Sequence, residues 1–553
     1  MPKYLELLES LRQAFPQPVS APIHDAYFVY SISRALDRVD KLKSQAPILG
    51  ERIEPNWKAA RDARVAEKGH SLEQVIGELV QSLQGMTIWG HPASQVNVVP
   101  PPSIASIIGF LLPATYNPNL VSEEGARCVA EVELRATSMA AELVGYDPDQ
   151  AGGLFTFGGT GAMLYAVRIG LEKALPGTHR EGLREKAAIL TSDQGHYSAL
   201  NVAGWLGLGL EQVQRARTGE DNAIDIDALE TALRDTLEQG TKIAAIISTM
   251  GSTDAFGLDN LKAIVELRDR LVNEFQLDYR PHVHADAVIG WAWSVFRDYD
   301  FTANALGFRG RTIRALASAL HELQHLAMAD SIGIDFHKTG YTPYVSSLIL
   351  FRNQNDLASM ERPRETMPYL FQSGEYHPGM YTLETTRAGT GPMAALANFL
   401  LFGKQGLRVL LGNAVGAAEA LREQLEAHPN LTVLNGQNVG PVTLFRVYPP
   451  GVDTFTVKQH ERHDPEFRDQ LLTYNAFNRR VFNRMHSDAM AGHGVALSMT
   501  DGYRTSDYGE PIAALKSYVL SPFANEARMG AIVEHVLEAL EAVHDEDQRR
   551  ETT

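Results

Sequence analysis

From about residue 123 to residue 400, short runs of apolar and β-branched residues alternate with segments of helical periodicity. One such run, Ile243-Ala-Ala-Ile-Ile-Ser-Thr249, is apolar for most of its length, as expected for a strand that is buried on both faces. Strands that alternate with helices form βαβ units, in which the strands lie parallel and the helices cover the sheet. The sequence therefore predicts an α/β domain built on a largely parallel sheet.

The length of the chain requires more than one domain, because a single hydrophobic core stops growing beyond about 250–300 residues. The chain has 553 residues, of which 44% are hydrophobic and 21% charged, an ordinary balance for a globular protein. We divide it into an N-terminal helical segment (residues 1–113), a large α/β domain (114–400) and a small α+β domain (401–553). In the last part, helical patterns flank strand-like segments near 442–447 and 494–498.

Charge and cysteine content narrow the class of partner and the compartment. With 50 basic against 67 acidic residues, the formal net charge is −17, which argues against nucleic acid and anionic membranes as partners. Cys128 is the single cysteine, so no internal disulfide framework is possible, and we expect a cytoplasmic protein. The N-terminal residues carry charges throughout, unlike a signal peptide, and the apolar run at 104–112 is too short to span a bilayer.

Two ionisable residues stand at predicted strand ends. Residues 331–336 form a short β-rich run that leads into His337 and Lys338, and the run at 281–285 leads into Asp286. Ligands of open α/β sheets bind at the carboxyl ends of the strands. A lysine that forms a Schiff base and an aspartate that pairs with a pyridinium nitrogen are the two groups that pyridoxal 5′-phosphate (PLP) requires of its protein. The sequence thus points to PLP as cofactor.

Three further groups follow predicted strands. The turn Gly158-Gly159-Thr160-Gly161 opens a helix, where free N–H groups and the helix dipole can hold a phosphate. His196 comes after the strand at 189–192, and Thr249 ends the strand at 243–249. Each group also has a plainer interpretation, as a glycine-rich turn, a loop histidine or a threonine in ordinary turn hydrogen bonds. Their joint occurrence at successive strand ends favours a cofactor site.

Several segments of this chain are similar to the motifs of a known enzyme family. The segments lie at residues 116–119, 131–135, 157–161, 196–198, 284–287, 330–344, 381–389 and 505–509, and the likeness covers roughly residues 90–525. On them the chain resembles the group II PLP-dependent amino-acid decarboxylases of the aspartate-aminotransferase-like (fold type I) superfamily. Within these it looks most like the bacterial tyrosine decarboxylase branch.

The resemblance implies a fold and a role for each matching residue. The large domain would carry a mostly parallel seven-stranded sheet flanked by helices. Lys338 would bind PLP covalently, Asp286 would keep the pyridine nitrogen protonated, and His196 would stack over the ring. Thr249 would contact the ring or its O3′ oxygen. The groups implied for the phosphate and its turn are Gly159, Thr160, Gly161, Ser331 and His337.

The resemblance also implies a mobile loop at about residues 358–380, with a tyrosine that protonates the product carbanion. Tyr369 is the best match for that tyrosine, and Tyr376 is the second choice. The chain departs from many relatives at Val288, where alanine is usual, and at Phe336, where proline is usual. Neither departure removes a reacting group. The family further implies a homodimer with active sites at the subunit interface, which the N-terminal helical segment wraps.

The expected reaction is the decarboxylation of an L-amino acid, with an aromatic substrate such as tyrosine. Decarboxylation of aspartate or glutamate remains an alternative, and so does another PLP-dependent lyase or an aminotransferase, in which Arg387 or Arg504 would clamp the substrate carboxylate. A catalytically silent protein of the same fold is disfavoured by the intact Lys338. For His321 and His325, four residues apart, a solvated helix face is favoured over a metal hydrolase, and no metal is expected.

Overall fold

The computed structural model describes residues 2–368 and 370–551. In this part of the chain the largest sheet has seven strands in the order β2-β8-β7-β6-β5-β3-β4. Its strands are β2 (Gly152–Thr156), β3 (Ala187–Ser192), β4 (Val213–Ala216), β5 (Lys242–Thr249), β6 (His282–Asp286), β7 (Ser331–Asp335) and β8 (Ser347–Phe351). All pairings from β7 to β4 are parallel, and β8 runs antiparallel to both of its neighbours.

Helices cover both faces of this sheet, and the alternation within β3 shows how. Ala187 and Ile189 pack beneath α8 and α10, whereas Ala188 and Leu190 join the core cluster on the opposite face. That opposite cluster includes buried side chains of α7, α11, α12 and α13. The helices are α7 (Cys128–Val144), α8 (Gly159–Ala174), α10 (Ser198–Trp205), α11 (Ile226–Glu238), α12 (Leu261–Glu274) and α13 (Gly310–Leu323), with the short α6 (Glu123–Ala126) and α9 (Thr178–Glu181) beside them. The strands are therefore largely buried, as their apolar composition requires, except for the edge strand β4, of which only the last residue is buried.

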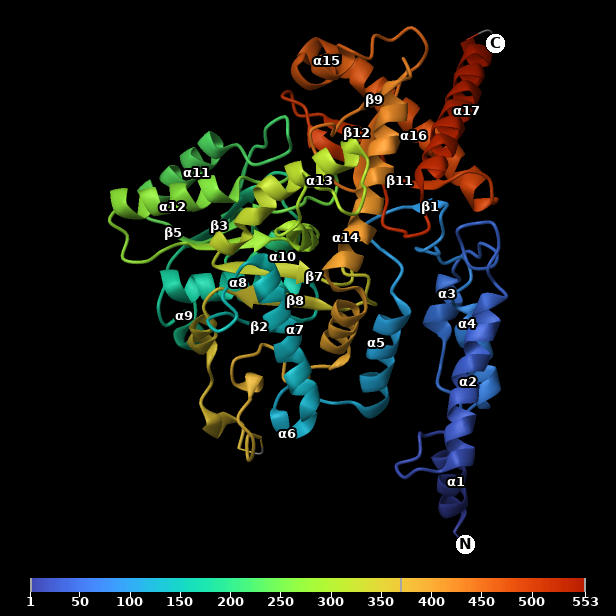
Figure 1. The fold of residues 1–553 in the computed structure, drawn as a ribbon, viewed down its shortest axis with the longest axis vertical. Helices are drawn as coiled ribbons and strands as arrows, with labels where there is room; N and C mark the ends of the chain where they lie inside the picture. Colours follow the sequence, from blue (N-terminus) through green and yellow to red (C-terminus); the bar gives the residue numbers. More distant parts are fainter. Residues whose placement is uncertain (1, 369, 552–553) are drawn as a thin grey trace.

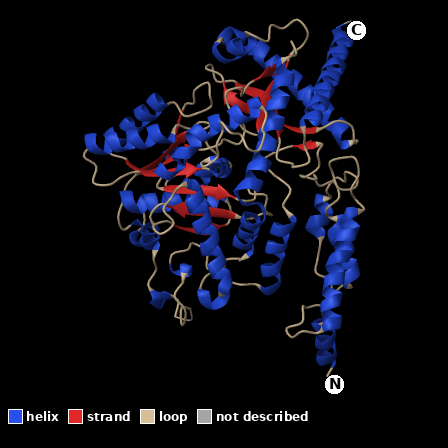
Figure 2. Cartoon of the chain, viewed as in Figure 1, coloured by secondary structure: helices blue, strands red, loops and turns tan. Residues whose placement is uncertain are grey.

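A second sheet belongs to the C-terminal part of the chain, and Figure 2 shows the strands as two separate groups. Its order is β1-β11-β12-β10-β9, with β1 pairing in parallel to β11. The strands are β1 (Ser94–Gln95), β9 (Leu431–Val433), β10 (Val442–Val447), β11 (Ala496–Thr505) and β12 (Pro511–Tyr518). The helices of this part are α15 (Val457–His463), α16 (Arg468–Met490) and α17 (Glu526–Glu551), the last two of which pack against each other.

The helix α14 (Thr390–Glu426) connects the two parts, and the predicted boundary at residue 400 falls inside it. Among the described residues this helix is the one that is long and apolar enough to cross a membrane. It packs against α5, α7, α13 and α17, however, and twenty of its residues are buried. Its composition is therefore that of a helix in the interior of the fold.

The N-terminal helices form an arm that projects from the body of the molecule, and the N-terminus lies at its far tip (Figure 1). The arm contains α1 (Lys3–Arg12), α2 (Pro22–Asp40), α3 (Trp57–Asp62) and α4 (Leu72–Gln81), and α5 (Ile104–Tyr116) follows it against α14. The helices α1, α2 and α3 have no buried residue. An amphipathic helix without a buried face lacks the partner that its apolar side calls for.

Candidate active site

Four of the predicted site residues meet at the carboxyl ends of neighbouring strands. Asp286 is the last residue of β6, and it lies in register with Thr249 at the end of β5 and with Gly333 of β7. Lys338 follows the end of β7, and His196 follows the end of β3, which is the next strand beyond β5. The parallel order of these strands thus brings together residues that are far apart in the sequence.

Asp335, at the end of β7, organises the lysine. One carboxylate oxygen, Oδ2, lies 3.1 Å from Lys338 Nζ and 3.5 Å from His337 Nε2. The other, Oδ1, accepts a 2.5 Å hydrogen bond from the Ser347 hydroxyl on β8. Sequence reasoning missed this carboxylate, although it stands within the segment that carries Lys338. Its only signal was its place at the end of a strand, three residues before the lysine.

The ionisable groups of this cluster shift one another's pKa values. Burial acts to lower the pKa of Lys338, but Asp335 and Asp286 outweigh it, and the pKa lies above its ordinary value. Burial raises the pKa of Asp286, opposed by His196 and Lys338. Burial likewise lowers the pKa of His196. A buried carboxyl with a raised pKa beside a charged lysine is an arrangement typical of functional sites.

His196 is held in one orientation by the start of α10. Its Nδ1 atom accepts a hydrogen bond from the Ser198 backbone N–H at 3.2 Å and lies 2.9 Å from the Ser198 hydroxyl. The ring also stacks on Tyr197, with the two ring centroids 4.3 Å apart. Because Nδ1 accepts, the ring proton of the neutral histidine lies on Nε2.

The glycine turn before α8 forms the cradle that the sequence predicts for a phosphate. Gly158 has a φ of 132°, which favours glycine, and a Cβ at Gly159 would lie only 3.0 Å from the Val288 side chain and 3.2 Å from Asp335 Oδ2. The first turn of a helix leaves N–H groups without partners within the helix. Gly159 and Thr160 begin this turn, and the N–H of Gly161 donates to the Gly158 carbonyl at 2.8 Å. The cradle therefore opens beside Asp335, Lys338 and His337.

The side chain of Thr249 offers the site a buried hydroxyl that the chain itself does not use. Its hydroxyl is buried and has no hydrogen-bond partner among the described residues. A buried polar atom without a partner is costly, so a ligand that supplies one fits this position. Asp259 fixes the Thr249 backbone by accepting its N–H at 2.6 Å, and burial raises the pKa of Asp259 to about 7. No sequence pattern points to this role, because Asp259 acts through a contact within the folded chain.

The structure does not bring Ser331 to the phosphate cradle. It begins β7, whereas Lys338 lies beyond the other end of that strand. Its hydroxyl oxygen lies 2.8 Å from His282 Nε2 and 2.9 Å from His284 Nδ1. This places Ser331 in a buried polar network inside the sheet, so we correct the phosphate role that the sequence suggested for it.

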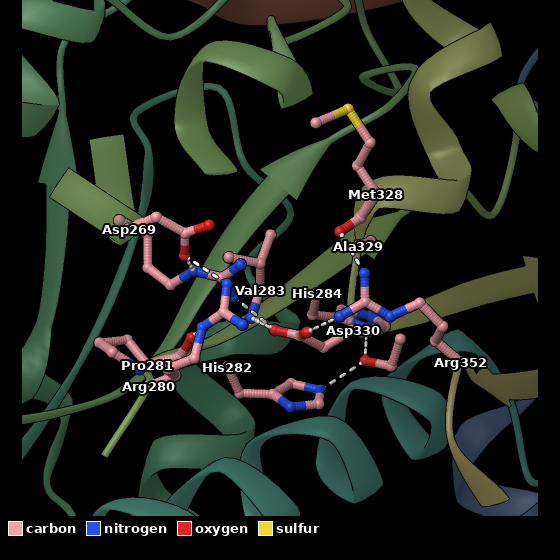
Figure 3. Close-up of polar contacts among 12 residues, drawn as sticks. Asp269, Arg280, Pro281, His282, Val283, His284, Met328, Ala329, Asp330 and Arg352 are labelled. Carbon is pink, nitrogen blue, oxygen red and sulfur yellow. Dashed lines mark hydrogen bonds and ion pairs between the residues drawn. The ribbon is translucent and has the colours of Figure 1, made fainter. Parts of the chain in front are cut away.

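Ion pairs close the outer side of the same network (Figure 3). Asp330 Oδ2 accepts from Arg268 at 2.7 Å and from the Val283 backbone N–H at 2.9 Å. Asp330 Oδ1 accepts from Arg352 at 2.8 Å. Arg268 is buried, so these contacts supply the partner that a buried charge requires. The network joins β6, β7 and α12 at the amino ends of the strands.

Of the two candidate loop tyrosines, the structure describes Tyr376. Tyr369 lies outside the described residues. Tyr376 is half-buried with its hydroxyl 3.4 Å from Glu133 Oε2, and its ring packs against the cluster of Leu120, Ala126 and Ala130. Glu133 in turn accepts from the Phe155 backbone N–H on β2. In this conformation Tyr376 serves the packing between α7 and the loop.

Both arginines that could act as an aminotransferase clamp have other partners. Arg387 is buried in an ion pair with Glu133 and also donates to the Phe155 carbonyl at 3.1 Å. Arg504 donates to the Gly219 carbonyl and to Asn222 Oδ1, each at 2.7 Å. Neither guanidinium is free to bind a substrate carboxylate in this conformation.

His321 near the end of α13 and His325 in the 3-10 turn that follows have the sequence His321-Glu-Leu-Gln-His325, which matches the H-E-x-x-H spacing of zinc hydrolases. Its ring centroids lie 6.5 Å apart, and His321 is exposed. Within residues 2–368 and 370–551, no group of three or more His, Cys, Asp and Glu side chains is placed to hold a metal ion.

Comparison with known proteins assigns the family. Residues 55–447 match the pyridoxal-dependent decarboxylase conserved domain. The chain belongs to this family. Its cofactor is therefore PLP, as the lysine and aspartate predicted. The orphaned Thr249 hydroxyl, the glycine cradle and the buried Asp286 all fit that group.

Individual relatives of the chain differ in the substrates that their names state. It is 23% identical over 373 residues to an aspartate 1-decarboxylase of Aliivibrio fischeri, and 24% identical over 396 residues to an L-tyrosine decarboxylase of Enterococcus faecium. The alignments cover 62% and 65% of this chain, and in each case 62% of the relative, which is less than two thirds of its length. Among solved structures, mouse CSAD in apo form superimposes with a TM-score of 0.75 at 18% identity, covering 94% of this chain and 99% of that chain. The likeness confirms the predicted fold type I architecture.

Proposed function

We propose that this protein is a PLP-dependent amino-acid decarboxylase whose substrate is an aromatic L-amino acid such as tyrosine. Family membership and the placement of Lys338, Asp286 and Thr249 around one strand-end site support the reaction. When bound, PLP supplies an electron sink for the bond between the α-carbon and the carboxylate. The amino-acid chain supplies the binding, the orientation and the protons.

Each proposed role follows from a position in the site. Lys338 would hold the cofactor covalently, Asp286 would keep a proton on the ring nitrogen, and His196 would cover one face of the ring. Thr249 would donate its free hydroxyl to a ring oxygen. The phosphate would lie on the first turn of α8, at Gly159, Thr160 and Gly161, with His337 beside it. A helix N-terminus favours an anion through its free N–H groups and its dipole.

A tyrosine of the 358–380 loop would complete the reaction by returning a proton to the substrate α-carbon. We assign this role to Tyr369, because Tyr376 is engaged with Glu133. Closure of such a loop also excludes water from the site. Replacing Tyr369 with phenylalanine should leave cofactor binding intact and abolish release of the amine product. Normal turnover by that variant would show that another group supplies the proton.

The aromatic substrate is supported by exposed rings that lie beside residues of the site. Tyr344 contacts His337, with ring centroids 4.5 Å apart, and Tyr197 stacks on His196. Phe157 lies directly before the glycine turn, 6.5 Å in ring-centroid distance from Trp205. All four aromatic side chains are exposed. Rings of this kind contact a flat aromatic side chain favourably through stacked or edge-to-face geometries.

Aspartate is the second candidate substrate, because a named aspartate 1-decarboxylase matches the chain almost as well as the tyrosine enzyme does. The deciding experiment incubates the PLP-loaded protein with L-tyrosine, L-aspartate, L-glutamate and L-2,4-diaminobutyrate. We expect carbon dioxide and tyramine from tyrosine, in equal amounts. Faster turnover of aspartate would replace the substrate proposal, and a keto acid product would replace the decarboxylase proposal with an aminotransferase.

We also propose that the enzyme works as a homodimer with active sites at the subunit interface. The apolar residues that support this are exposed along α5: Ile104, Ile107, Ile108, Leu111, Leu112 and Tyr116. Exposed apolar patches of this extent mark interaction surfaces. The arm formed by α1 to α4 offers a second unpartnered surface. Sedimentation equilibrium of the PLP-loaded protein tests the proposal, and a monomer at micromolar concentration would refute it.

A cytoplasmic location is proposed on the basis of the single cysteine, which fits a reducing compartment. The exposed position of Cys128 is consistent with a free thiol. Fractionation of cells that produce the tagged protein is the test. Recovery in the membrane or the exported fraction would contradict this location.

A further inference from the structure

The proposed phosphate cradle already contains a negative charge. The Asp335 carboxylate is buried, and a Cβ placed on Gly159 would lie 3.2 Å from Oδ2 and 3.3 Å from Oδ1. The carboxylate therefore lies against the first turn of α8, at the positive end of the helix dipole. It also engages Lys338 at 3.1 Å and His337 at 3.5 Å. The groups that would attract a phosphate are thus shared with an aspartate.

The negative charge of Asp335 is balanced by the positive charge of Lys338, and a bound phosphate would add further negative charge. Burial acts to raise its pKa, but Lys338 and His337 outweigh it, so that the pKa lies below its ordinary value and the carboxyl is ionised. The pKa of Lys338 is raised, so this amine is already protonated and has no capacity for another proton. The pKa of His337 is lowered by burial, so this ring is neutral. A phosphate dianion brought beside the ionised carboxylate adds like charge to a buried site, which raises the pKa of the groups there.

We propose that capture of the cofactor phosphate is accompanied by the uptake of one proton from water by the Asp335–His337 pair. The pair then changes from a net charge of −1 to neutral, and it offers the phosphate an N–H or O–H donor where an ionised carboxylate stood. The added proton belongs to the pair as a unit, because strongly coupled groups titrate together. This inference rests on the proposed placement of the phosphate at the first turn of α8.

Several other ionisable groups lie around Asp335 and influence its charge. Those that interact with it are Lys338 and His337 from the turn after β7, Asp286 from β6, His196 from the loop after β3, and Tyr344 from the segment before β8. The neighbouring Ser347 on β8 contributes a hydroxyl that donates to Oδ1. Asp286 interacts with the ring nitrogen in the proposed site. Two ligands that have the same ring therefore require the same proton at this position.

Calorimetry with a cofactor analogue counts the proton directly. The probe is 4′-deoxypyridoxine 5′-phosphate, which carries the phosphate and the ring but has no aldehyde to react with Lys338. Titrations near pH 8 in two buffers of different ionisation enthalpy give the number of protons taken up per ligand bound. We expect the wild-type apoprotein to take up about one proton more than the Asp335→Asn variant. We also expect Asp335→Asn to bind the probe more tightly, because the repelling charge is gone.

A matched control separates this site from any lysine–aspartate pair. Lys173 and Asp356 form such a pair at 2.6 Å, at the amino ends of the strands. The Asp356→Asn variant should take up the same number of protons as the wild type. Equal uptake by the wild type and Asp335→Asn would overturn the inference and leave the proposed function standing. If the probe fails to bind the wild type, the placement of the phosphate is wrong, and the inference falls with it.

A second measurement needs no substitution at Asp335, in case that variant does not fold. In the wild type, proton uptake with 4′-deoxypyridoxine 5′-phosphate is compared with uptake on binding 4′-deoxypyridoxine, which shares the ring but lacks the phosphate. Because the two ligands have the same ring, any proton taken up at the ring nitrogen contributes equally to both measurements. A difference of about one proton supports the inference, and no difference refutes it.

Discussion

At the residue scale, the site depends on two polar atoms, one with a partner in the chain and one without. Lys338 Nζ has Asp335 as its nearest anion, whereas the Thr249 hydroxyl has no partner within the described chain. The Lys338 amine is held in place by an ion pair, whereas the Thr249 hydroxyl is available to a ligand. These two cases give opposite expectations for stability, since removal of a paired group costs free energy and removal of an orphaned one does not.

Lys338→Ala tests the covalent attachment. The variant should lose the visible absorbance band that PLP gains when it binds a lysine, and its turnover should fall to the uncatalysed background. The exposed Lys262→Ala is the control, and it should keep both the band and the activity. A band that survives in Lys338→Ala would assign the attachment to a different lysine.

Thr249→Val tests the orphaned hydroxyl. Because that hydroxyl bonds to nothing in the chain, the free energy of unfolding of the apoprotein should change by less than about 0.5 kcal/mol. The dissociation constant of PLP should rise by about fivefold, the equivalent of one neutral hydrogen bond of about 1 kcal/mol. Chemical denaturation and fluorescence titration measure the two quantities. A stability loss without a change in PLP affinity would make Thr249 a structural residue.

At the scale of the element, β6 and β7 carry different chemistry at their two ends. The carboxyl ends present Asp286 and Asp335 to the site, and the amino ends hold the buried network of Ser331, His282 and His284. Ser331 therefore has a packing role that is distinct from the cofactor. This distinction can be tested, because the two roles predict different losses.

Ser331→Ala should destabilise the protein without weakening cofactor binding. Two buried imidazole nitrogens would lose their shared partner, which costs about 1–3 kcal/mol. Urea denaturation of the apoprotein measures this loss, and titration with PLP should give an unchanged dissociation constant. A weaker PLP affinity with normal stability would restore the phosphate role that the sequence suggested.

The same network predicts acid sensitivity. Burial lowers the pKa of both His282 and His284 to about 3, whereas an unfolded histidine titrates near 6.5. Between these values the unfolded chain binds more protons, so stability is complete above pH 6.5 and falls as the pH drops toward 3, by up to about 1.4 kcal/mol per pH unit for each ring. Unfolding curves from pH 7 to 4 should show a smaller loss for His282→Gln than for the wild type. His321→Gln, at an exposed position, should follow the wild type.

The site residues that could be predicted from the sequence are those that stand at the ends of predicted strands. His196, Thr249, Asp286 and Lys338 were found because each follows or ends a run that is apolar enough to be a buried strand. Asp335 was missed because its importance comes from the approach of α8, which no local pattern records. The phosphate role of Ser331 was implied by the family resemblance, but Ser331 begins the five-residue strand β7 and Lys338 lies beyond the other end of that strand. The short strand β4 and the C-terminal strand β12 carried too little pattern to be identified.

At the scale of the whole molecule, the chain exposes surfaces that a single copy does not bury. The apolar side of α5 is exposed, and the arm of α1 to α4 projects from the body of the molecule. The proposed dimer would bury them. The stability of such an assembly then depends on protein concentration and on these exposed residues.

Ile104→Asp tests the dimer at a highly exposed position on α5. The side chain is 78% exposed in one chain, so the substitution should leave the fold of the monomer unchanged. In a symmetric dimer the change occurs twice, and each copy loses about 1.5–3 kcal/mol of apolar burial and adds a charge to the interface. We expect the dimer dissociation constant to rise by at least 100-fold in sedimentation, with activity falling in proportion to the monomer formed. Phe455→Asp, a comparably exposed position on the C-terminal part, should leave both unchanged, and an Ile104→Asp protein that remains dimeric would place the interface elsewhere.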